Sequence, residues 1–215
     1  MSVVKHFISE TIKKVEIDEF LRNELDRAGY GGVDATKTPM GTHLVIYAMR
    51  PGLVIGRGGE NIKGLTRILE ETFEMSNPQI SVAEIEVPEL NPYIMASRIT
   101  LSLKRGVHYR RAGFWALNRI LEAGAVGVEI IISGKLRTDR SRYEKFNSGY
   151  LPKSGEPALK HVKKAVVNVQ LKPGILGVKV QIMPPDTSFT DRVSIVEETP
   201  KEGKLDEEVE KSAHL

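Results

Sequence analysis

The chain has 215 residues, of which 31 are lysine or arginine and 28 are aspartate or glutamate, and it contains no cysteine. Its length allows one or two domains with a sizeable core, and the absence of cysteine excludes a disulfide scaffold, a thiolate zinc site and a cysteine nucleophile. No apolar segment approaches the ~20 residues that a membrane helix needs, so we expect a soluble, intracellular protein with no membrane partner.

The first third of the chain predicts two helical segments followed by two strands. Ile8, Ile12 and Val15 recur at helical spacing, the segment from Ile17 to Leu25 does so again, and Gly29 can end the second helix. The expected strands cover residues 33–38 and 42–49, with a bend at residues 39–41 between them. Because the second strand is apolar on both faces, we expect it to be central.

A glycine-rich segment follows, and after it comes an amphipathic helix. Arg50-Pro51-Gly52 breaks the strand, and Gly56-Arg57-Gly58-Gly59 lies between Val54-Ile55 and Glu60-Asn61-Ile62. The helix places Ile62, Leu65, Leu69 and Phe73 on one stripe. Residues 80–87 read as a third strand, and the break in alternation after Val82 predicts a bulge.

The second half of the chain predicts two helices and then β-structure. Asn91-Pro92 is typical of a helix start, so one helix should reach about Arg105 and another should run from about Tyr109 to Ala123. The alternating segments that predict strands are 126–132, 165–171 and 176–182, with a tight turn at Pro173-Gly174. Residues 135–142 read as a basic connection.

Charge is unevenly distributed along the chain. Between Lys104 and Lys164 there are 14 basic and 5 acidic residues, whereas from Pro184 to Leu215 there are 4 basic and 9 acidic residues. A basic segment of this density usually binds phosphate, although a solvated surface is the alternative for any single basic helix. The acidic tail lacks hydrophobic periodicity, so we expect it to be disordered.

Three phosphate-binding patterns compete for the glycine-rich segment. The Walker pattern fails because Leu65 follows Gly64 where a lysine is required, and the dinucleotide pattern fails because Asn61 occupies the place of the third glycine. The Gly-x-x-Gly pattern of KH domains fits Gly56 to Gly59. Glycines allow the backbone to approach a polynucleotide, the following helix directs its N-terminal amides at phosphate, and Arg57 adds a charge.

Several longer motifs carry a resemblance to a known family. They are Arg50 to Gly59, Arg110-Arg111-Ala112, Gly124 to Val128, Ser133-Gly134-Lys135, Gly149 to Pro152 and Gly177 to Val180. With these motifs the chain resembles the family of the third protein of the small ribosomal subunit, in its archaeal form. The resemblance covers nearly the whole ordered chain.

The resemblance implies a fold and a function. We expect an α+β fold with a type II KH domain and N-terminal helices in residues 1–90, a second helix-plus-sheet domain in residues 91–184 and a flexible acidic tail in residues 185–215. The family implies a non-enzymatic, cytoplasmic constituent of the small ribosomal subunit without cofactor or metal. Its expected partners are ribosomal RNA in the subunit head, messenger RNA where it enters the subunit, and neighbouring head proteins.

The candidate RNA-binding residues come from the glycine segment and from the basic middle of the chain. They are Gly56, Arg57, Gly58, Gly59, Lys63, Arg110, Arg111, Lys135, Arg137, Arg140, Arg142 and Lys145. Arginines suit phosphate because their planar donors are arranged as a fork. Bacterial members carry further arginines after the Arg-Arg pair, whereas this chain has Phe114 and Trp115. Trp115 could stack on a base, but packing within the helices is the favoured interpretation.

Two other functions remain open at this point. A free RNA-binding regulator or processing factor could also carry a KH domain, although such proteins usually join it to modules unlike this second domain. A nicking enzyme that uses a lysine amine is the remaining alternative, but nothing in the sequence marks one lysine as activated.

Overall fold

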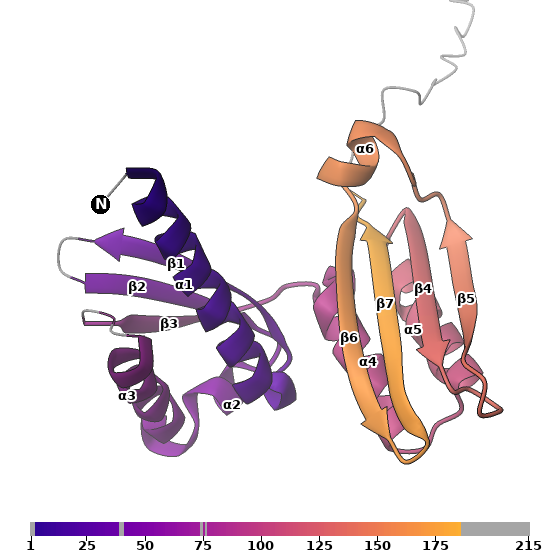
Figure 1. Cartoon of the computed structure of the whole chain (residues 1–215), viewed down its shortest axis with the longest axis horizontal. Coiled ribbons are helices and arrows are strands. Elements are labelled where there is room, and N and C mark those ends of the chain that lie inside the picture. Colours follow the sequence, from indigo (N-terminus) through magenta and orange to yellow (C-terminus); the bar gives the residue numbers. More distant parts are fainter. Residues whose placement is uncertain (1–2, 39–40, 74, 76, 186–215) are drawn as a thin grey trace, which may run out of the picture.

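The computed structural model describes residues 3–38, 41–73, 75 and 77–185. It contains two β-sheets, each with its own hydrophobic core, connected through the short 3-10 turn η3 (Pro88–Leu90) (Figure 1). The predicted α+β fold class is confirmed. Within the described residues, no helix combines the length and the apolar character needed to cross a membrane. The expectation for the acidic tail concerns residues that, from 186 onward, lie outside the described part.

The first sheet has three strands in the order β1–β2–β3. In this sheet β1 (Tyr30–Thr38) is antiparallel to β2 (Gly41–Ala48), and β2 is parallel to β3 (Gln79–Glu84). The helices α1 (Val3–Glu24), α2 (Pro51–Ile55) and α3 (Glu60–Phe73) contribute to the core of this unit. Sequence periodicity does not reveal α2, because five residues are too few to display a helical repeat.

The central position of β2 is confirmed by its burial. Leu44, Ile46 and Ala48 alternate along β2 and are inaccessible to solvent, since they pack against Leu21 of α1 and Leu69 of α3 in one cluster. The parallel pairing of β2 with β3 requires a crossover, which α2 and α3 provide. The glycine segment is therefore held between two helices that the sheet fixes in place.

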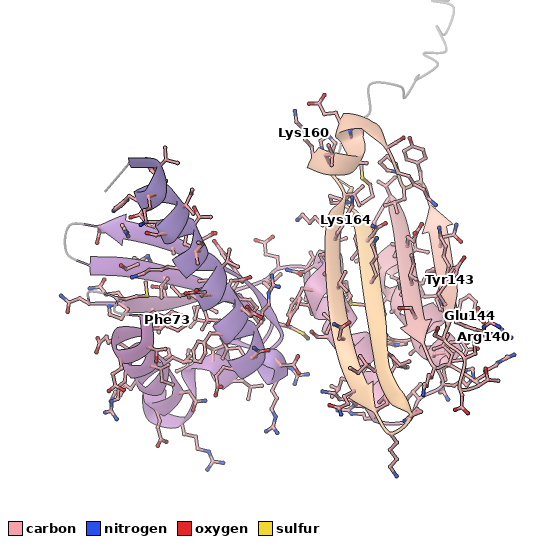
Figure 2. All side chains as sticks on the ribbon, in the orientation of Figure 1. Phe73, Arg140, Tyr143, Glu144, Lys160 and Lys164 are labelled. Atoms are coloured by element: carbon pink, nitrogen blue, oxygen red, sulfur yellow. The ribbon has the colours of Figure 1, made fainter. Side chains whose placement is uncertain are left out.

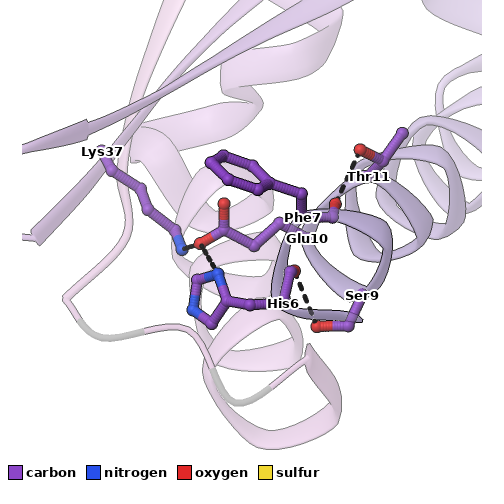
Figure 3. Close-up of polar contacts among 6 residues, drawn as sticks. All are labelled: His6, Phe7, Ser9, Glu10, Thr11 and Lys37. Atoms are coloured by element: carbon purple, nitrogen blue, oxygen red, sulfur yellow. Dashed lines mark hydrogen bonds and ion pairs between the residues drawn. The ribbon is translucent and has the colours of Figure 1, made fainter. Parts of the chain in front are cut away.

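The N-terminal region forms one helix, so the prediction of two helical segments was wrong. The two apolar stripes lie on different faces of α1: Ile17 and Leu21 enter the core, while Ile8, Ile12 and Val15 are exposed. The first half of α1 is attached to β1 through an ion pair between Glu10 and Lys37 (Figure 3). Periodicity detects both stripes but cannot tell which one meets the sheet.

The third strand is shorter than predicted and contains no bulge. It pairs with β2 in unbroken register from Gln79 to Glu84. Alternation ends after Val82 because the strand itself is ending, and Ile85 turns toward Gly31 instead. The irregularity in this sheet lies in β1, between Tyr30 and Gly32.

The second sheet has four antiparallel strands in the order β5–β4–β7–β6. The helices α4 and α5 lie behind this sheet in Figure 1, where α4 packs on β6 and β7 and α5 packs on β4 and β5. The bounds of these elements are α4 (Pro92–Lys104), α5 (Tyr109–Glu122), β4 (Gly127–Gly134), β5 (Arg142–Gly149), α6 (Gly155–Lys160), β6 (Lys163–Leu171) and β7 (Gly174–Met183).

Strand β5 was not predicted, whereas both long helices and the three other strands were. Its sequence, Arg-Tyr-Glu-Lys-Phe-Asn-Ser-Gly, buries only Phe146, so it lacks the apolar alternation of a half-buried strand. An edge strand needs only one good contact with the core, and Phe146 supplies it against α5. The basic connection before β5 is thereby shortened to residues 135–141.

Asn91 joins the two units and begins α4, as the sequence predicts for the start of this helix. Its side-chain Oδ1 accepts hydrogen bonds from the backbone amides of Tyr93 at 3.0 Å and Ile94 at 3.5 Å. Its Nδ2 donates a hydrogen bond to the Gly31 carbonyl of β1 at 3.0 Å. One side chain thus caps a helix of the second unit and binds a strand of the first.

Candidate nucleic-acid interface

The glycine loop (Gly56–Gly59) connects α2 to α3 with backbone angles that favour glycine. Gly56, Gly58 and Gly59 have φ values of 73°, 63° and 77°, in the left-handed region. A Cβ atom on Gly58 or Gly59 would meet nothing within 4 Å, so the backbone there faces open space. The geometry leaves peptide groups accessible to a ligand directly in front of the first turn of α3.

Asn61 fixes the start of this loop. Its Nδ2 donates a hydrogen bond to the Leu53 carbonyl of α2 at 3.1 Å, and its side chain occupies the space in which a Cβ of Gly56 would lie, only 2.6 Å from it. Gly56 is therefore favoured both by its backbone angle and by a close contact, whereas Gly58 and Gly59 are favoured by backbone angle alone.

The side chains around the glycine loop offer both charge and apolar surface. Arg57 and Lys63 are exposed, and neither has a hydrogen bond or ion pair with another described residue. Leu53 and Ile55 are also exposed, while Val54 between them is buried in the core. Exposed apolar side chains beside a cationic loop suit the bases and phosphates of a single strand.

A second cationic surface lies at one end of the four-stranded sheet. Gly134 at the end of β4 pairs with both Arg142 and Leu176, so the 135–141 connection and the β6–β7 turn lie at the same end. The start of α5 is there too, because Tyr109 and Arg110 contact Glu144 of β5. We call this surface the basic end; its cations are Lys104, Arg105, Arg110, Arg111, Lys135, Arg137, Arg140, Arg142 and Lys172.

Six of the predicted RNA-binding residues are brought together at the basic end, and three of its cations were not predicted. Lys104 and Arg105 end α4, and Lys172 lies in the β6–β7 turn. In the sequence alone, nothing distinguishes these three basic residues from ordinary surface residues. The signal that could have identified them is their place at the ends of elements that meet at one edge of the sheet.

Most cations of the basic end have no acidic partner within the described residues. This applies to Arg111, Lys135, Arg137, Arg140 and Arg142, all of which are exposed. Guanidinium groups that are free of protein carboxylates can bind phosphate without first breaking an ion pair. The high local charge is therefore available to an external polyanion.

Arg110 is the exception, because it is held by Glu144. Its Nη2 lies 3.3 Å from the Glu144 carboxylate, and this hydrogen bond raises the pKa of the guanidinium above its ordinary value. Tyr109 donates to the same carboxylate at 3.5 Å. Figure 2 shows Arg140, Tyr143 and Glu144 close together at this end of the sheet.

Lys145 belongs to a different environment from the other candidates. It lies on the sheet face opposite α5, and its Nζ is 2.8 Å from the carboxylate of Glu129, a residue whose side chain is only 8% exposed. Lys153 binds the same carboxylate at 3.3 Å. Burial would raise the pKa of Glu129, but the hydrogen bonds from these two lysines outweigh it and hold that pKa below its ordinary value.

The lysines of the 160–164 segment lie away from the basic end. Figure 2 shows Lys160 and Lys164 at the end of the second unit that carries α6, distant from Arg140. Lys163 pairs in register with Ile182, near the start of β4 rather than its end. Lys160 forms an ion pair with Glu156. Charge density along the sequence therefore groups basic residues that the fold places on two separate surfaces.

The preferred interpretation of Trp115, packing within the helices, was wrong. Trp115 is 42% exposed and Phe114 is 56% exposed, whereas the core positions of α5 are taken by Ala112, Ala116 and Ile120. These residues fill the side of α5 that faces the core, so neither aromatic ring is needed there. Both rings are consequently on the surface of a helix that begins at the basic end.

This geometry defines the class of protein. A helix, two strands, a glycine loop between two helices and a parallel third strand make a type II KH domain, and residues 16–90 match the KH domain family. The second helix-and-sheet unit is not part of that domain, and residues 99–182 match the family described as ribosomal protein S3, C-terminal domain.

Whole-chain relatives identify the family. The chain is 52% identical over 190 residues to small ribosomal subunit protein uS3 of Methanothermobacter thermautotrophicus, covering 88% of this chain and 74% of that protein. It is 46% identical over 196 residues to the protein of the same name from Saccharolobus solfataricus, covering 91% of this chain and 85% of that one. The chain belongs to the uS3 family of small ribosomal subunit proteins, as its resemblance predicts.

Proposed function

We propose that this chain is a structural, non-enzymatic component of the small ribosomal subunit that binds ribosomal RNA and other ribosomal proteins. The observation that carries the proposal is the basic end, where exposed cations come together from the end of α4, the start of α5, the 135–141 connection and the β6–β7 turn, most of them with no acidic partner among the residues that the structure describes. Such a surface has no use in a packed core and suits the phosphates of a folded RNA. The names of the relatives support the same role.

We further propose that the glycine loop and the basic end bind different parts of the RNA. The glycine loop with Arg57 and Lys63 suits a few nucleotides of unpaired RNA, since its contacts are mainly backbone amides. The basic end suits a longer path of phosphates, including messenger RNA where it enters the subunit and ribosomal RNA in the head. Arg110, Arg111, Lys135, Arg137, Arg140 and Arg142 are the residues to which we assign this contact.

Sedimentation of the full chain from native cells tests the assembly proposal. A tagged copy should move with small subunits in a sucrose gradient and stay with them after a moderate salt wash. Recovery of the chain only in the soluble fractions at low salt, bound to short RNAs, would instead indicate a free KH regulator.

Crosslinking within intact subunits tests the division of surfaces. Ultraviolet crosslinks from the basic end should include messenger RNA, and those from the glycine loop should map to unpaired ribosomal RNA. Crosslinks to protein alone at the basic end would contradict its assignment to RNA, even if the chain is in the subunit.

A further inference from the structure

The outward surface of α5 carries two exposed aromatic rings beside an arginine. Arg111 precedes Phe114 by three residues and Trp115 by four. Asn118 follows Phe114 by four residues and Trp115 by three. Residues at these spacings are neighbours on a helix surface. We call Arg111, Phe114, Trp115 and Asn118 the α5 outer face; all four are exposed.

The ring of Phe114 is fixed in place from below. Gly113 has no side chain, and a Cβ there would lie 2.7 Å from the ring of Phe146, so the glycine admits that ring against the helix. Phe146 in turn contacts Phe114 edge-to-face, with ring centroids 5.1 Å apart. A glycine inside a helix is destabilising relative to alanine, and here it allows a buried ring to support an exposed one.

The charges around the α5 outer face favour a polyanion. Arg111 has no partner in the described part of the chain, and Arg110 lies beside it at the start of the helix. The nearby carboxylates, Glu144 and Glu122, are paired with Arg110 at 3.3 Å and with Arg119 at 3.6 Å. Free positive charge and exposed rings therefore share one surface that is continuous with the basic end.

From this arrangement we propose that the α5 outer face is a stacking platform for unpaired RNA bases. Trp115 and Phe114 stack on successive bases, Arg111 binds the adjoining phosphate, and Asn118 offers an amide to a base edge. The inference rests on the proposed function, because it specifies how the basic end holds a single strand. It assigns a binding role to aromatic residues at the positions where the family resemblance leads one to expect further arginines.

A protein partner is the competing occupant, and the observations favour RNA over it. These rings are flanked within one helical turn by Arg110 and by Arg111, whose guanidinium has no partner in the described part of the chain and presents a planar fork of donors that matches a phosphate. Alternating aromatic and basic side chains are the pattern by which proteins hold single-stranded nucleic acid.

Trp115 is the only tryptophan of the chain, so its fluorescence reports this surface directly. We would titrate the full chain with a short oligouridylate and with a fully paired RNA hairpin of equal charge. Stacking predicts that the single strand quenches the emission while the hairpin binds without quenching it. Equal emission changes with both RNAs would overturn the proposal.

Variants distinguish the contribution of the Trp115 ring to RNA affinity from that of the Arg111 charge. Trp115→Leu should weaken binding of a labelled oligouridylate about tenfold and leave the slope of log affinity against log salt unchanged, whereas Trp115→Phe should retain most of the affinity. Arg111→Gln should reduce that slope by about 0.7. Leu159→Ala, which removes an exposed apolar side chain on α6, is the matched control and should change neither quantity.

The outcomes distinguish this inference from the proposed function. If the arginine variant changes the slope but Trp115→Leu binds like the parent, RNA binding at the basic end stands and the stacking platform is refuted. If Trp115→Leu instead lowers incorporation into small subunits without affecting oligouridylate binding, the surface is a protein contact. If no basic-end variant changes the slope, the proposed RNA contact itself fails.

Discussion

The glycine loop and the basic end are proposed to bind the same kind of ligand by different physical means. The glycine loop is four consecutive residues at the start of a 14-residue helix, and its three glycines have positive φ angles. The basic end is assembled from helix ends, a strand connection and a hairpin turn, and its interaction with RNA would depend on side-chain charge. One surface is set by the backbone, the other by the convergence of distant segments.

The two surfaces should therefore respond differently to substitutions and to salt. A backbone surface is damaged by a single substitution that alters conformation or introduces the wrong charge, and in the glycine loop only Arg57 and Lys63 add to the salt dependence. A surface of free cations loses affinity in steps as charges are removed, and each phosphate contact adds to the salt dependence. Variants in the two regions can therefore be told apart by the slope of affinity against salt.

The largest effect is expected from neutralising the connection before β5. Replacing Lys135, Arg137, Arg140 and Arg142 with glutamine should lower affinity for single-stranded RNA on the order of a hundredfold at 0.1 M salt and reduce the salt slope by about 3. The control replaces Lys160, Lys163 and Lys164 at the opposite end and should have a much smaller effect. Equal losses from both sets would show that net charge, rather than the basic end, governs binding.

The next effect concerns stability and separates Lys145 from the RNA-binding cations. Glu129→Gln leaves Lys145 and Lys153 beside a neutral amide, so it should lower the free energy of unfolding by about 2 kcal/mol and leave RNA affinity unchanged. The measurement is denaturant unfolding alongside RNA titration. A stability equal to that of the parent would indicate that the two ion pairs contribute nothing.

The same carboxylate predicts a dependence of stability on pH. Since the pKa of Glu129 is lower in the folded state than its ordinary value of 4.5, its contribution is complete above that value and is lost as pH falls through the folded-state pKa. The parent should thus lose more stability than Glu129→Gln on acidification below about pH 4.5. Parallel stability curves would contradict the assignment.

A smaller effect on binding is expected in the glycine loop. Gly58→Asp places a negative charge where phosphate is expected and should weaken single-strand binding about tenfold, with little change in the salt slope. Gly58→Asn is the matched control, because asparagine tolerates the same left-handed angle without the charge. If both variants bind alike, the loop does not contact RNA.

The smallest effect is expected where the two units meet. Asn91→Ala removes the cap of α4 and the hydrogen bond to Gly31, and should cost about 1 kcal/mol of unfolding free energy. Asn91→Asp keeps an acceptor for the cap but cannot donate to the Gly31 carbonyl. An aspartate variant as unstable as the alanine variant would mean that the bond between the units, rather than the cap, carries the contribution.

Much of the fold follows from local patterns in the sequence. The central strand β2, the amphipathic helix α3, the start of α4 at Asn91 and the β6–β7 turn are each specified by neighbouring residues. The elements that sequence analysis missed have no such local pattern: α2 is five residues long, and β5 has a single buried side chain. The bulge predicted in β3 failed because a strand end and a bulge interrupt alternation in the same way.

The sequence specifies the glycine loop, because a backbone with positive φ angles favours glycine, and Gly56, Gly58 and Gly59 lie within four residues of the chain. It also determined the family, through motifs spread along the chain. Three outcomes follow from tertiary packing: which stripe of α1 is buried, which cations gather at the basic end, and the outward position of Trp115. Those outcomes depend on which helix faces meet a sheet and on where distant strands turn back. Such contacts join segments that are far apart in the sequence, so the spacing of residues within one segment does not reveal them.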